Sequence, residues 1–245
     1  MKTYGLIGFP LSHSFSQKYF AEKFQKEGMV NCRYKSYPIG SIEEIKALVK
    51  SDPGLMGLNV TIPYKQSVLS YLDNTDSLPA GLRACNCIRI KEGKMIGYNT
   101  DVAGFEKSLR PNLKACHTGA LVLGNGGAAD AIKFVLNKLK LKYKVVSRKI
   151  HHDSDFIYDE LGESIIKECK LIINTTPLGT FPDIYECPDI PYRFLTPEHF
   201  LYDLVYNPEK TLFLQKGEAR GTTIKNGYEM LLLQAEESWR IWNED

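Results

Sequence analysis

The sequence predicts an α/β protein with two domains, on the strength of three observations. Segments that read as strands and as helices alternate along nearly all of the 245 residues, a pattern typical of sheets built mostly from parallel strands. A chain of this length contains one or two domains of roughly 100–200 residues each. Hydrophobic residues make up 43% and charged residues 24%, which is ordinary for a globular protein and excludes disorder or a fibrous repeat.

The first series of expected elements lies within residues 1–101. The helices are predicted from apolar residues three or four apart, and the strands from short β-branched or alternating runs. The last two strands flank Lys91-Glu92-Gly93-Lys94, a sequence typical of a hairpin turn. In order, we expect a strand at 4–7, a helix at 15–24, a strand at 32–37, a helix at 42–49, a strand at 58–61 and two strands at 86–90 and 95–98.

The second series runs to the end of the chain. We expect a strand at 120–123, a helix at 128–139, strands at 143–146, 171–173, 200–203 and 222–224, and a last helix at 228–242. On that helix Tyr228, Leu231, Leu232, Ala235, Trp239 and Trp242 form one apolar face. No linker stands out by composition. Motifs therefore place the boundary, giving one domain of residues 1–101 completed by a C-terminal helix (226–245), and a second domain of residues 102–225.

A glycine-rich turn opens the second series. Gly124-Asn125-Gly126-Gly127-Ala128-Ala129 matches G-x-G-x-x-A between a strand and a helix. Small residues allow a tight turn, a close approach of backbone to a pyrophosphate, and close packing of helix on strand. A phosphate there meets free N–H groups at the positive end of the helix dipole. The motif alone could be an ordinary turn, but its context predicts a Rossmann-type, doubly wound dinucleotide-binding domain.

The end of the next strand bears on the choice of dinucleotide. NAD enzymes usually place Asp or Glu there to bind the ribose hydroxyls, whereas this chain has Ser147-Arg148-Lys149. A guanidinium can pair with a 2′-phosphate through its planar fork, so the sequence favours NADP(H) over NAD. The alternative is that Arg148 and Lys149 are ordinary solvated surface charges.

Several other functions are not expected. The lysines at 133, 138, 140, 142 and 144 form a basic stripe, but the chain's formal net charge is only +2, so a solvated helix face is favoured over nucleic-acid binding. The six cysteines include no C-x-x-C pair, and Cys85-Asn86-Cys87 lacks further ligands at zinc spacing, so no metal is expected. Without an apolar run near 18–20 residues or a signal peptide, we expect a cytoplasmic protein that does not enter membranes.

Polar residues follow three strands of the first domain. Ser14 and Ser16 open a helix, Asn59 and Thr61 alternate at the end of a strand with Lys65 after it, and Asn99-Thr100-Asp101 closes another strand. Open α/β sheets bind ligands at the carboxyl ends of their strands, and a helix start suits a carboxylate. Each group alone could be a helix cap or turn.

Taken together, these residues resemble those of the shikimate dehydrogenase family. The resemblance covers nearly the whole chain in order, and the pairing of N-V-T-x-P-x-K with N-T-D is its most specific part. The matching segments are Gly8-x-Pro10, Ser14-x-Ser16, Asn59-Val60-Thr61-x-Pro63-x-Lys65, Asn86, Asn99-Thr100-Asp101, Gly124-x-Gly126-Gly127-Ala128, Asn174-x-Thr176, Tyr202-Asp203 and Gln234-Ala235.

The resemblance implies NADPH-dependent reduction of 3-dehydroshikimate to shikimate, with an N-terminal α/β substrate domain. It makes Lys65 and Asp101 the catalytic pair, in which Lys65 stabilises and protonates the developing alkoxide. Ser14, Ser16 and Tyr206 then bind the substrate carboxylate, and Asn59, Thr61, Asn86, Asp101 and Gln234 bind ring hydroxyls. The implied cofactor-binding residues are Gly124, Asn125, Gly126, Gly127, Ala128, Ser147, Arg148, Lys149, Thr175, Gly227 and Met230.

Some positions depart from the family pattern. Ser147 stands where an asparagine is usual before the phosphate-binding Arg148, the second basic residue of that clamp has no clean match, and Glu229 replaces a residue that is commonly small. Two alternatives therefore remain: an NAD-linked quinate/shikimate dehydrogenase, against which Ser16 argues, and a non-catalytic ligand sensor, against which Lys65 and Asp101 argue. We expect a small-molecule substrate, no nucleic acid, and a monomer or homodimer.

Overall fold

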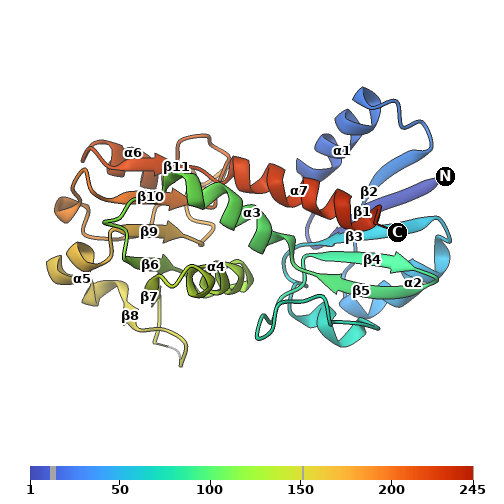
Figure 1. Ribbon diagram of the computed structural model, residues 1–245, viewed down its shortest axis with the longest axis horizontal. Coiled ribbons are helices and arrows are strands. Elements are labelled where there is room, and N and C mark those ends of the chain that lie inside the picture. Colours follow the sequence, from blue (N-terminus) through green and yellow to red (C-terminus); the bar gives the residue numbers. More distant parts are fainter. Residues whose placement is uncertain (12–14, 151, 245) are drawn as a thin grey trace. The chain divides into compact units, whose positions relative to one another are not determined.

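The computed structural model describes residues 1–11, 15–150 and 152–244, and the chain divides into two compact units (Figure 1). Unit 1 comprises Met1–Thr100 and the C-terminal residues from Gln234 on, and unit 2 comprises Asp101–Leu233. The chain thus crosses between units after Thr100 and again after Leu233, inside the last helix, whereas the motifs placed the second crossing near residue 226.

Unit 1 is built on a five-stranded mixed sheet. Its strands are β1 (Lys2–Gly8), β2 (Cys32–Pro38), β3 (Leu55–Val60), β4 (Cys87–Lys91) and β5 (Lys94–Tyr98), in the order β2-β1-β3-β4-β5. The first three strands are parallel, and β4 and β5 pair antiparallel. The predicted hairpin turn is confirmed: Glu92 and Gly93 have φ of 54° and 75°, the left-handed pair that a two-residue turn of matching twist requires.

Apolar side chains form two clusters in unit 1. One contains Ile7, Ile45 and Leu58, and the other contains Tyr4, Phe20 and Trp242. Alternate residues of a strand point to opposite faces, so both faces of the sheet are covered. The helical elements of the unit are α1 (Phe15–Lys26), η1 (Ile42–Glu44), α2 (Ile45–Ser51), η2 (Ser67–Tyr71) and the end of α7 (Tyr228–Trp242).

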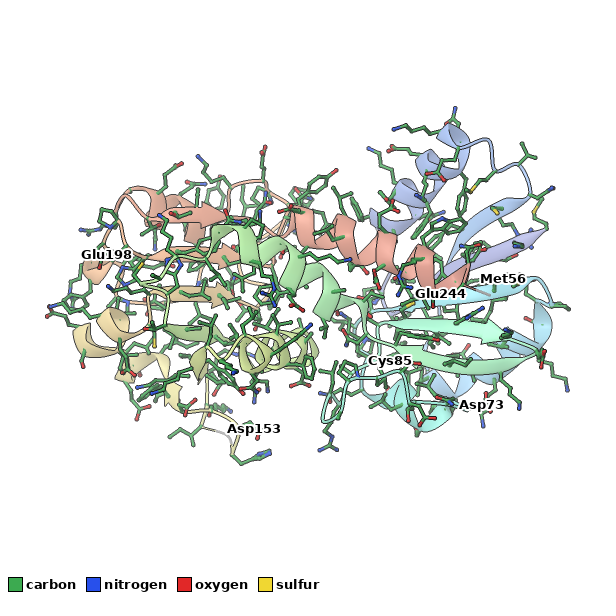
Figure 2. The ribbon with its side chains drawn as sticks, viewed as in Figure 1. Met56, Asp73, Cys85, Asp153, Glu198 and Glu244 are labelled. Carbon is green, nitrogen blue, oxygen red and sulfur yellow. The ribbon has the colours of Figure 1, made fainter. Side chains whose placement is uncertain are left out.

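The two neighbouring cysteines of unit 1 lie in different clusters. Cys85 packs with Ile7 and Leu58, and Cys87 packs with Tyr4 and Trp242; Figure 2 labels Cys85 beside β4. β4 begins only at Cys87, so strand alternation does not set the direction of the Cys85 side chain. All six cysteines have free thiols.

Unit 2 is built on a six-stranded parallel sheet. Its strands are β6 (Gly119–Leu123), β7 (Lys142–Ser147), β8 (Phe156–Ile157), β9 (Leu171–Asn174), β10 (Phe200–Asp203) and β11 (Thr223–Lys225), in the order β11-β10-β9-β6-β7-β8. All its pairs are parallel. This is the order of a doubly wound dinucleotide-binding domain, so the predicted α/β class is confirmed.

The link between β7 and β8 is unusually short for parallel strands. Only residues 148–155 join them, whereas a parallel connection normally needs a dozen residues or more and usually a helix. Figure 2 labels Asp153 in this link. Asp155 stabilises it by accepting a hydrogen bond from Val145 N on Oδ2 (2.7 Å) and donating its own N–H to Val145 O (2.9 Å).

The helical elements of unit 2 include several that the sequence pattern did not predict. They are α3 (Thr100–Leu109), η3 (Arg110–Asn112), α4 (Gly127–Lys138), η4 (Tyr158–Glu160), α5 (Glu163–Glu168), η5 (Tyr192–Phe194), α6 (Leu212–Glu218) and the first part of α7. Of these, α3, α5 and α6 were missed, as was β8. The core of the unit includes Leu121, Ile172 and Phe213. Tyr228, predicted on the apolar face of α7, is 48% exposed.

Candidate functional site

The candidate substrate residues of unit 1 lie near the carboxyl ends of β1 and β3. The chain leaves β1 toward α1 and β2 on one side, while β3 pairs on the other side, and ligands of open α/β sheets bind at such a switch point. Backbone hydrogen bonds join the two exits, from Thr61 N to Ile7 O (3.0 Å) and from Phe9 N to Ile62 O (3.1 Å). The proposed substrate residues Ser16, Asn59, Thr61 and Lys65 follow these exits.

Asn59 is buried at the end of β3, and its carboxamide is held on both sides. Its Oδ1 accepts a hydrogen bond from the Tyr34 hydroxyl (2.9 Å), and its Nδ2 donates to Ser238 Oγ (2.9 Å) and to Asn86 O (3.4 Å). These contacts join β2, β3 and α7, so three elements far apart in the chain fix one side chain.

Asn86 and Gln234 belong to the same buried polar network. Asn86 Oδ1 accepts from Thr100 N (2.6 Å), and Asn86 Nδ2 donates to Thr100 Oγ1 (3.1 Å). The Thr100 hydroxyl lies 3.4 Å from Gln234 Oε1 and 3.1 Å from Ser238 Oγ, while Ser238 donates to Gln234 O (2.9 Å). All four side chains are buried, as expected of polar groups whose bonds are satisfied.

Ser16 is buried in the first turn of α1. Ser14, its predicted partner in carboxylate binding, lies outside the described residues.

Lys65 and Thr61 are positioned by the backbone after β3. Tyr64 N donates to Thr61 O (2.9 Å), and Cys85 N donates to Lys65 O (2.8 Å), which ties this turn to the start of β4. Both side chains are half-buried. Lys65 thus belongs to unit 1, whereas Asp101, buried in the first turn of α3, is the first residue of unit 2.

The glycine-rich turn of unit 2 has the geometry that a bound pyrophosphate needs. Gly124 has φ of 103°, a conformation that favours glycine, and a Cβ there would lie 2.8 Å from Thr175 Oγ1. Gly126 is the N-cap of α4 and has open space where a Cβ would lie. Thr175 donates to Leu123 O (2.7 Å), and so fixes the turn at the switch point between β6 and β9.

A lysine and an aspartate support the same turn. Lys133 Nζ donates to Asn125 Oδ1 (3.1 Å) and pairs with Asp130 Oδ1 (2.9 Å), with both side chains about four-fifths buried. The pair neutralises the acidic group that α4 carries in its first turn, where a free carboxylate would repel a phosphate. Neither residue was predicted to take part in the site.

Ser147, Arg148 and Lys149 differ in what they offer a cofactor. Ser147 is buried and donates its hydroxyl to Lys149 O, which shapes the turn after β7. Arg148 and Lys149 are exposed, and the described part of the chain holds no carboxylate paired with the Arg148 guanidinium. The residues present therefore fit a dinucleotide phosphate, with Arg148 as the group available to it.

The basic stripe around α4 and β7 is largely neutralised. Lys133 pairs with Asp130, Lys138 with Glu106 (2.6 Å), and Lys144 with Glu168 (2.9 Å). Three of the five lysines of the stripe are therefore paired with carboxylates.

A buried carboxylate organises the loop that carries Tyr206. Asp203 accepts hydrogen bonds from Asn174 Nδ2 (2.9 Å), Val205 N (3.0 Å) and Thr211 Oγ1 (2.5 Å). Burial outweighs these bonds and raises the pKa of Asp203 to about 6. Burial also raises the pKa of Tyr206, which keeps its phenol protonated and able to donate to a carboxylate.

The start of α7 is closely packed. A side chain at Gly227 would collide with Leu204 O, so only glycine fits there. Met230 is buried one turn later. Glu229, which departs from the family pattern, forms an ion pair with Lys225 four residues earlier, so its charge is balanced within the turn.

Among the described residues, no helix is long and apolar enough to cross a membrane, and no group of three or more His, Cys, Asp or Glu side chains could hold a metal ion.

Three hydroxyls of the buried network were not predicted from the sequence, those of Tyr34, Thr100 and Ser238. Of these three, only Thr100 could have been named from the sequence, because it lies between Asn99 and Asp101 in the motif.

Comparisons with known proteins show which family the chain is similar to. Residues 6–88 match the family described as the shikimate dehydrogenase substrate binding domain. A shikimate dehydrogenase (NADP(+)) of Clostridium beijerinckii is 39% identical over 100% of this chain and 93% of its own length. That of Desulforamulus reducens is 32% identical over 97% of this chain and 88% of its own.

A solved structure is similar over the same extent. The shikimate 5-dehydrogenase of Thermus thermophilus in complex with NADP(H) and shikimate has a TM-score of 0.86 and 27% identity, over 99% of this chain and 94% of that one. With sequence relatives above 30% identity that it covers almost completely, the chain belongs to the shikimate dehydrogenase family.

Proposed function

We propose that the chain catalyses the reversible NADPH-dependent reduction of 3-dehydroshikimate to shikimate, a step of aromatic amino-acid biosynthesis. The observation that carries this proposal is the buried network of unit 1, in which Asn59, Asn86 and Gln234 are joined through the hydroxyls of Thr100 and Ser238. Such a set of polar groups suits a small, polyhydroxylated acid, which is the substrate class of the family.

The substrate is bound through its carboxylate and its ring hydroxyls. Ser16 and Tyr206, together with Ser14, donate hydrogen bonds to the carboxylate. The residues that bind ring hydroxyls are Asn59, Thr61, Asn86, Asp101 and Gln234. Buried, satisfied side chains of this kind hold fixed positions, which favours binding of one orientation of the ring.

Lys65 and Asp101 carry the proton chemistry. NADPH, when bound, supplies a hydride to the carbonyl carbon, and the carbonyl oxygen gains negative charge as that C–H bond forms. The Lys65 ammonium stabilises this oxygen and donates the proton that completes the hydroxyl. Asp101 accepts a hydrogen bond from a substrate hydroxyl. In the reverse direction Lys65 accepts the proton of the substrate hydroxyl.

Unit 2 holds NADP(H). The backbone of Gly124, Gly126, Gly127 and Ala128 binds the pyrophosphate at the N-terminus of α4, and Arg148 binds the 2′-phosphate. The other residues assigned to the cofactor are Asn125, Ser147, Lys149, Thr175, Gly227 and Met230. We further propose a cytoplasmic location, no nucleic-acid partner, and a monomeric or homodimeric state.

A steady-state assay with both cofactors and both acids tests this function. We expect NADPH-dependent reduction of 3-dehydroshikimate, and oxidation of shikimate in preference to quinate. Equal or faster turnover with NAD and quinate would instead favour the NAD-linked quinate/shikimate dehydrogenase. Binding of shikimate without any turnover would favour the non-catalytic sensor.

A further inference from the structure

A buried tyrosine of β2 is hydrogen-bonded to a residue of the proposed substrate site. Tyr34 is 8% exposed, and its ring stacks on Phe20 with centroids 4.7 Å apart and planes 13° apart. Its hydroxyl donates to Asn59 Oδ1 over 2.9 Å. This hydrogen bond therefore links β2 with the end of β3.

The direction of the hydrogen bond between Tyr34 and Asn59 depends on whether the phenol keeps its proton. Burial raises the pKa of Tyr34 well above its ordinary value, so the phenol stays protonated and donates its single proton to Asn59.

The hydrogen bonds that Asn59 makes within the protein limit those that it can make to a ligand. Its two Nδ2 protons point to Ser238 Oγ (2.9 Å) and Asn86 O (3.4 Å), and one Oδ1 lone pair accepts from Tyr34. The capacity that remains is the second lone pair of Oδ1. Asn59 thus faces a ligand as an acceptor, which suits a hydroxyl group and does not suit a carbonyl or an ether oxygen.

We propose that Tyr34 is a positioning residue, whose hydroxyl holds the Asn59 carboxamide with its oxygen toward a hydroxyl group of the substrate. Ser238 completes the arrangement by holding the nitrogen. The inference rests on the proposed function, since it assigns the acceptor to a ring hydroxyl of the substrate. It predicts that an analogue with a methoxy group in place of that hydroxyl is rejected.

Tyr34→Phe tests this role, because it removes the hydroxyl and keeps the ring that stacks on Phe20. A buried acceptor that loses its donor is costly, so kcat/KM for shikimate should fall roughly 5- to 100-fold, with KM for NADP⁺ unchanged. The matched control is Tyr4→Phe. Tyr4 lies in the same aromatic cluster, but its hydroxyl donates to Asn243 (3.3 Å) rather than to a proposed substrate residue. Equal losses in the two variants would overturn the proposal.

A double-mutant cycle separates positioning from a general effect on stability. If Tyr34 acts through Asn59, Tyr34→Phe should have no further effect on kcat/KM for shikimate in an Asn59→Ala background. The preference for the hydroxyl over the methoxy analogue should also be lost in either single variant. Multiplicative losses in the double variant would show that Tyr34 acts independently of Asn59, contrary to the proposal.

A readout that needs no turnover distinguishes this proposal from the proposed function. In the NMR spectrum, the Asn59 side-chain amide protons should exchange slowly in the wild-type chain and faster in Tyr34→Phe. If exchange responds in this way but the wild-type chain oxidises no shikimate, the proposed function is wrong and the orienting role of Tyr34 stands. If exchange is unchanged in Tyr34→Phe, the orienting role is wrong whatever the activity.

Discussion

Asn174 donates a hydrogen bond from Nδ2 to Oδ1 of Asp203 over 2.9 Å, and this pair joins the carboxyl ends of the adjacent strands β9 and β10. Asn174 Oδ1 in turn accepts from Thr176 N (3.0 Å), and Asp203 Oδ2 accepts from Thr211 at the start of α6. The loop with Thr175 and the loop with Tyr206 are therefore anchored to one buried carboxylate.

The raised pKa of Asp203 predicts a pH dependence of stability. Its pKa is about 6 in the folded chain against an ordinary value of 3.8. Between these values the unfolded chain has released a proton that the folded chain keeps, so the free energy of unfolding falls as pH rises. The fall amounts to roughly 3 kcal/mol, since each pKa unit corresponds to about 1.4 kcal/mol, and it levels off above the folded pKa.

Urea unfolding of the wild type and of Asp203→Asn, measured across this pH range, checks the dependence. The variant should be less stable overall by about 1–3 kcal/mol, because its new N–H₂ group faces hydrogen-bond donors. It should also lack the part of the pH slope that Asp203 causes. An identical slope in both proteins would show that another group titrates.

Lys65→Met should lower kcat about 10²- to 10⁴-fold with a modest change in KM, because it removes the proposed proton donor at the carbonyl oxygen. Lys94→Met, at an exposed lysine of the same unit in the β4–β5 turn, is the matched control and should keep wild-type rates. A Lys65 variant that retains most of its kcat would contradict the proposed role of Lys65 as the proton donor.

Arg148→Gln should raise KM for NADP⁺ by about 10- to 100-fold, since a hydrogen bond to a charged group contributes about 1.5–3 kcal/mol. KM for NAD⁺, which lacks the 2′-phosphate, should change little. Arg220→Gln, at another exposed arginine of unit 2, controls for loss of a positive charge. Equal effects on the two cofactors would place Arg148 away from the 2′-phosphate.

Lys133→Met should raise KM for NADPH several-fold, because the Asp130 carboxylate then loses its ion pair with Lys133 in the first turn of α4, where the anionic phosphate is proposed to bind. Adding Asp130→Asn to this variant should restore part of the affinity. Lys138→Met, on the same helix and paired with Glu106, should leave KM unchanged. No recovery in the double variant would contradict the electrostatic explanation.

Gly227→Ala should destabilise unit 2 by about 1–3 kcal/mol, since a Cβ there collides with Leu204 O and forces the backbone to shift. Gly162→Ala is a control in the same unit, because a Cβ at Gly162 meets open space. It should cost less than about 1 kcal/mol. The midpoints of urea unfolding for the two variants check this prediction. Similar midpoints would show that the turn before α7 can adjust.

Much of the fold could be predicted because its signals are local. The helix at 228–242 matches α7 residue for residue, and the hairpin at 91–94 follows from Glu92-Gly93. One element missed, α3, has ten residues. The other three are short: β8 has two residues, and α5 and α6 have six and seven. Such segments give too few turns or alternations for a period to be read, and contacts with the sheet stabilise them.

Some residues of the candidate site could likewise be predicted from the sequence, and others could not. Residues in motifs, such as Lys65 and Gly124, could be named from sequence because their neighbours define their context. Tyr34 and Ser238 could not, because they act on Asn59 from 25 and 179 residues away. A tyrosine in an alternating strand and a serine in an amphipathic helix look like ordinary structural residues until the fold brings them together.

The most direct test of the central claim is the rate of NADPH oxidation by the purified chain when 3-dehydroshikimate is added. The account predicts turnover that depends on this substrate, is much faster with NADPH than with NADH, and yields shikimate. Absence of turnover with 3-dehydroshikimate under conditions where the chain is folded and binds NADPH would contradict it.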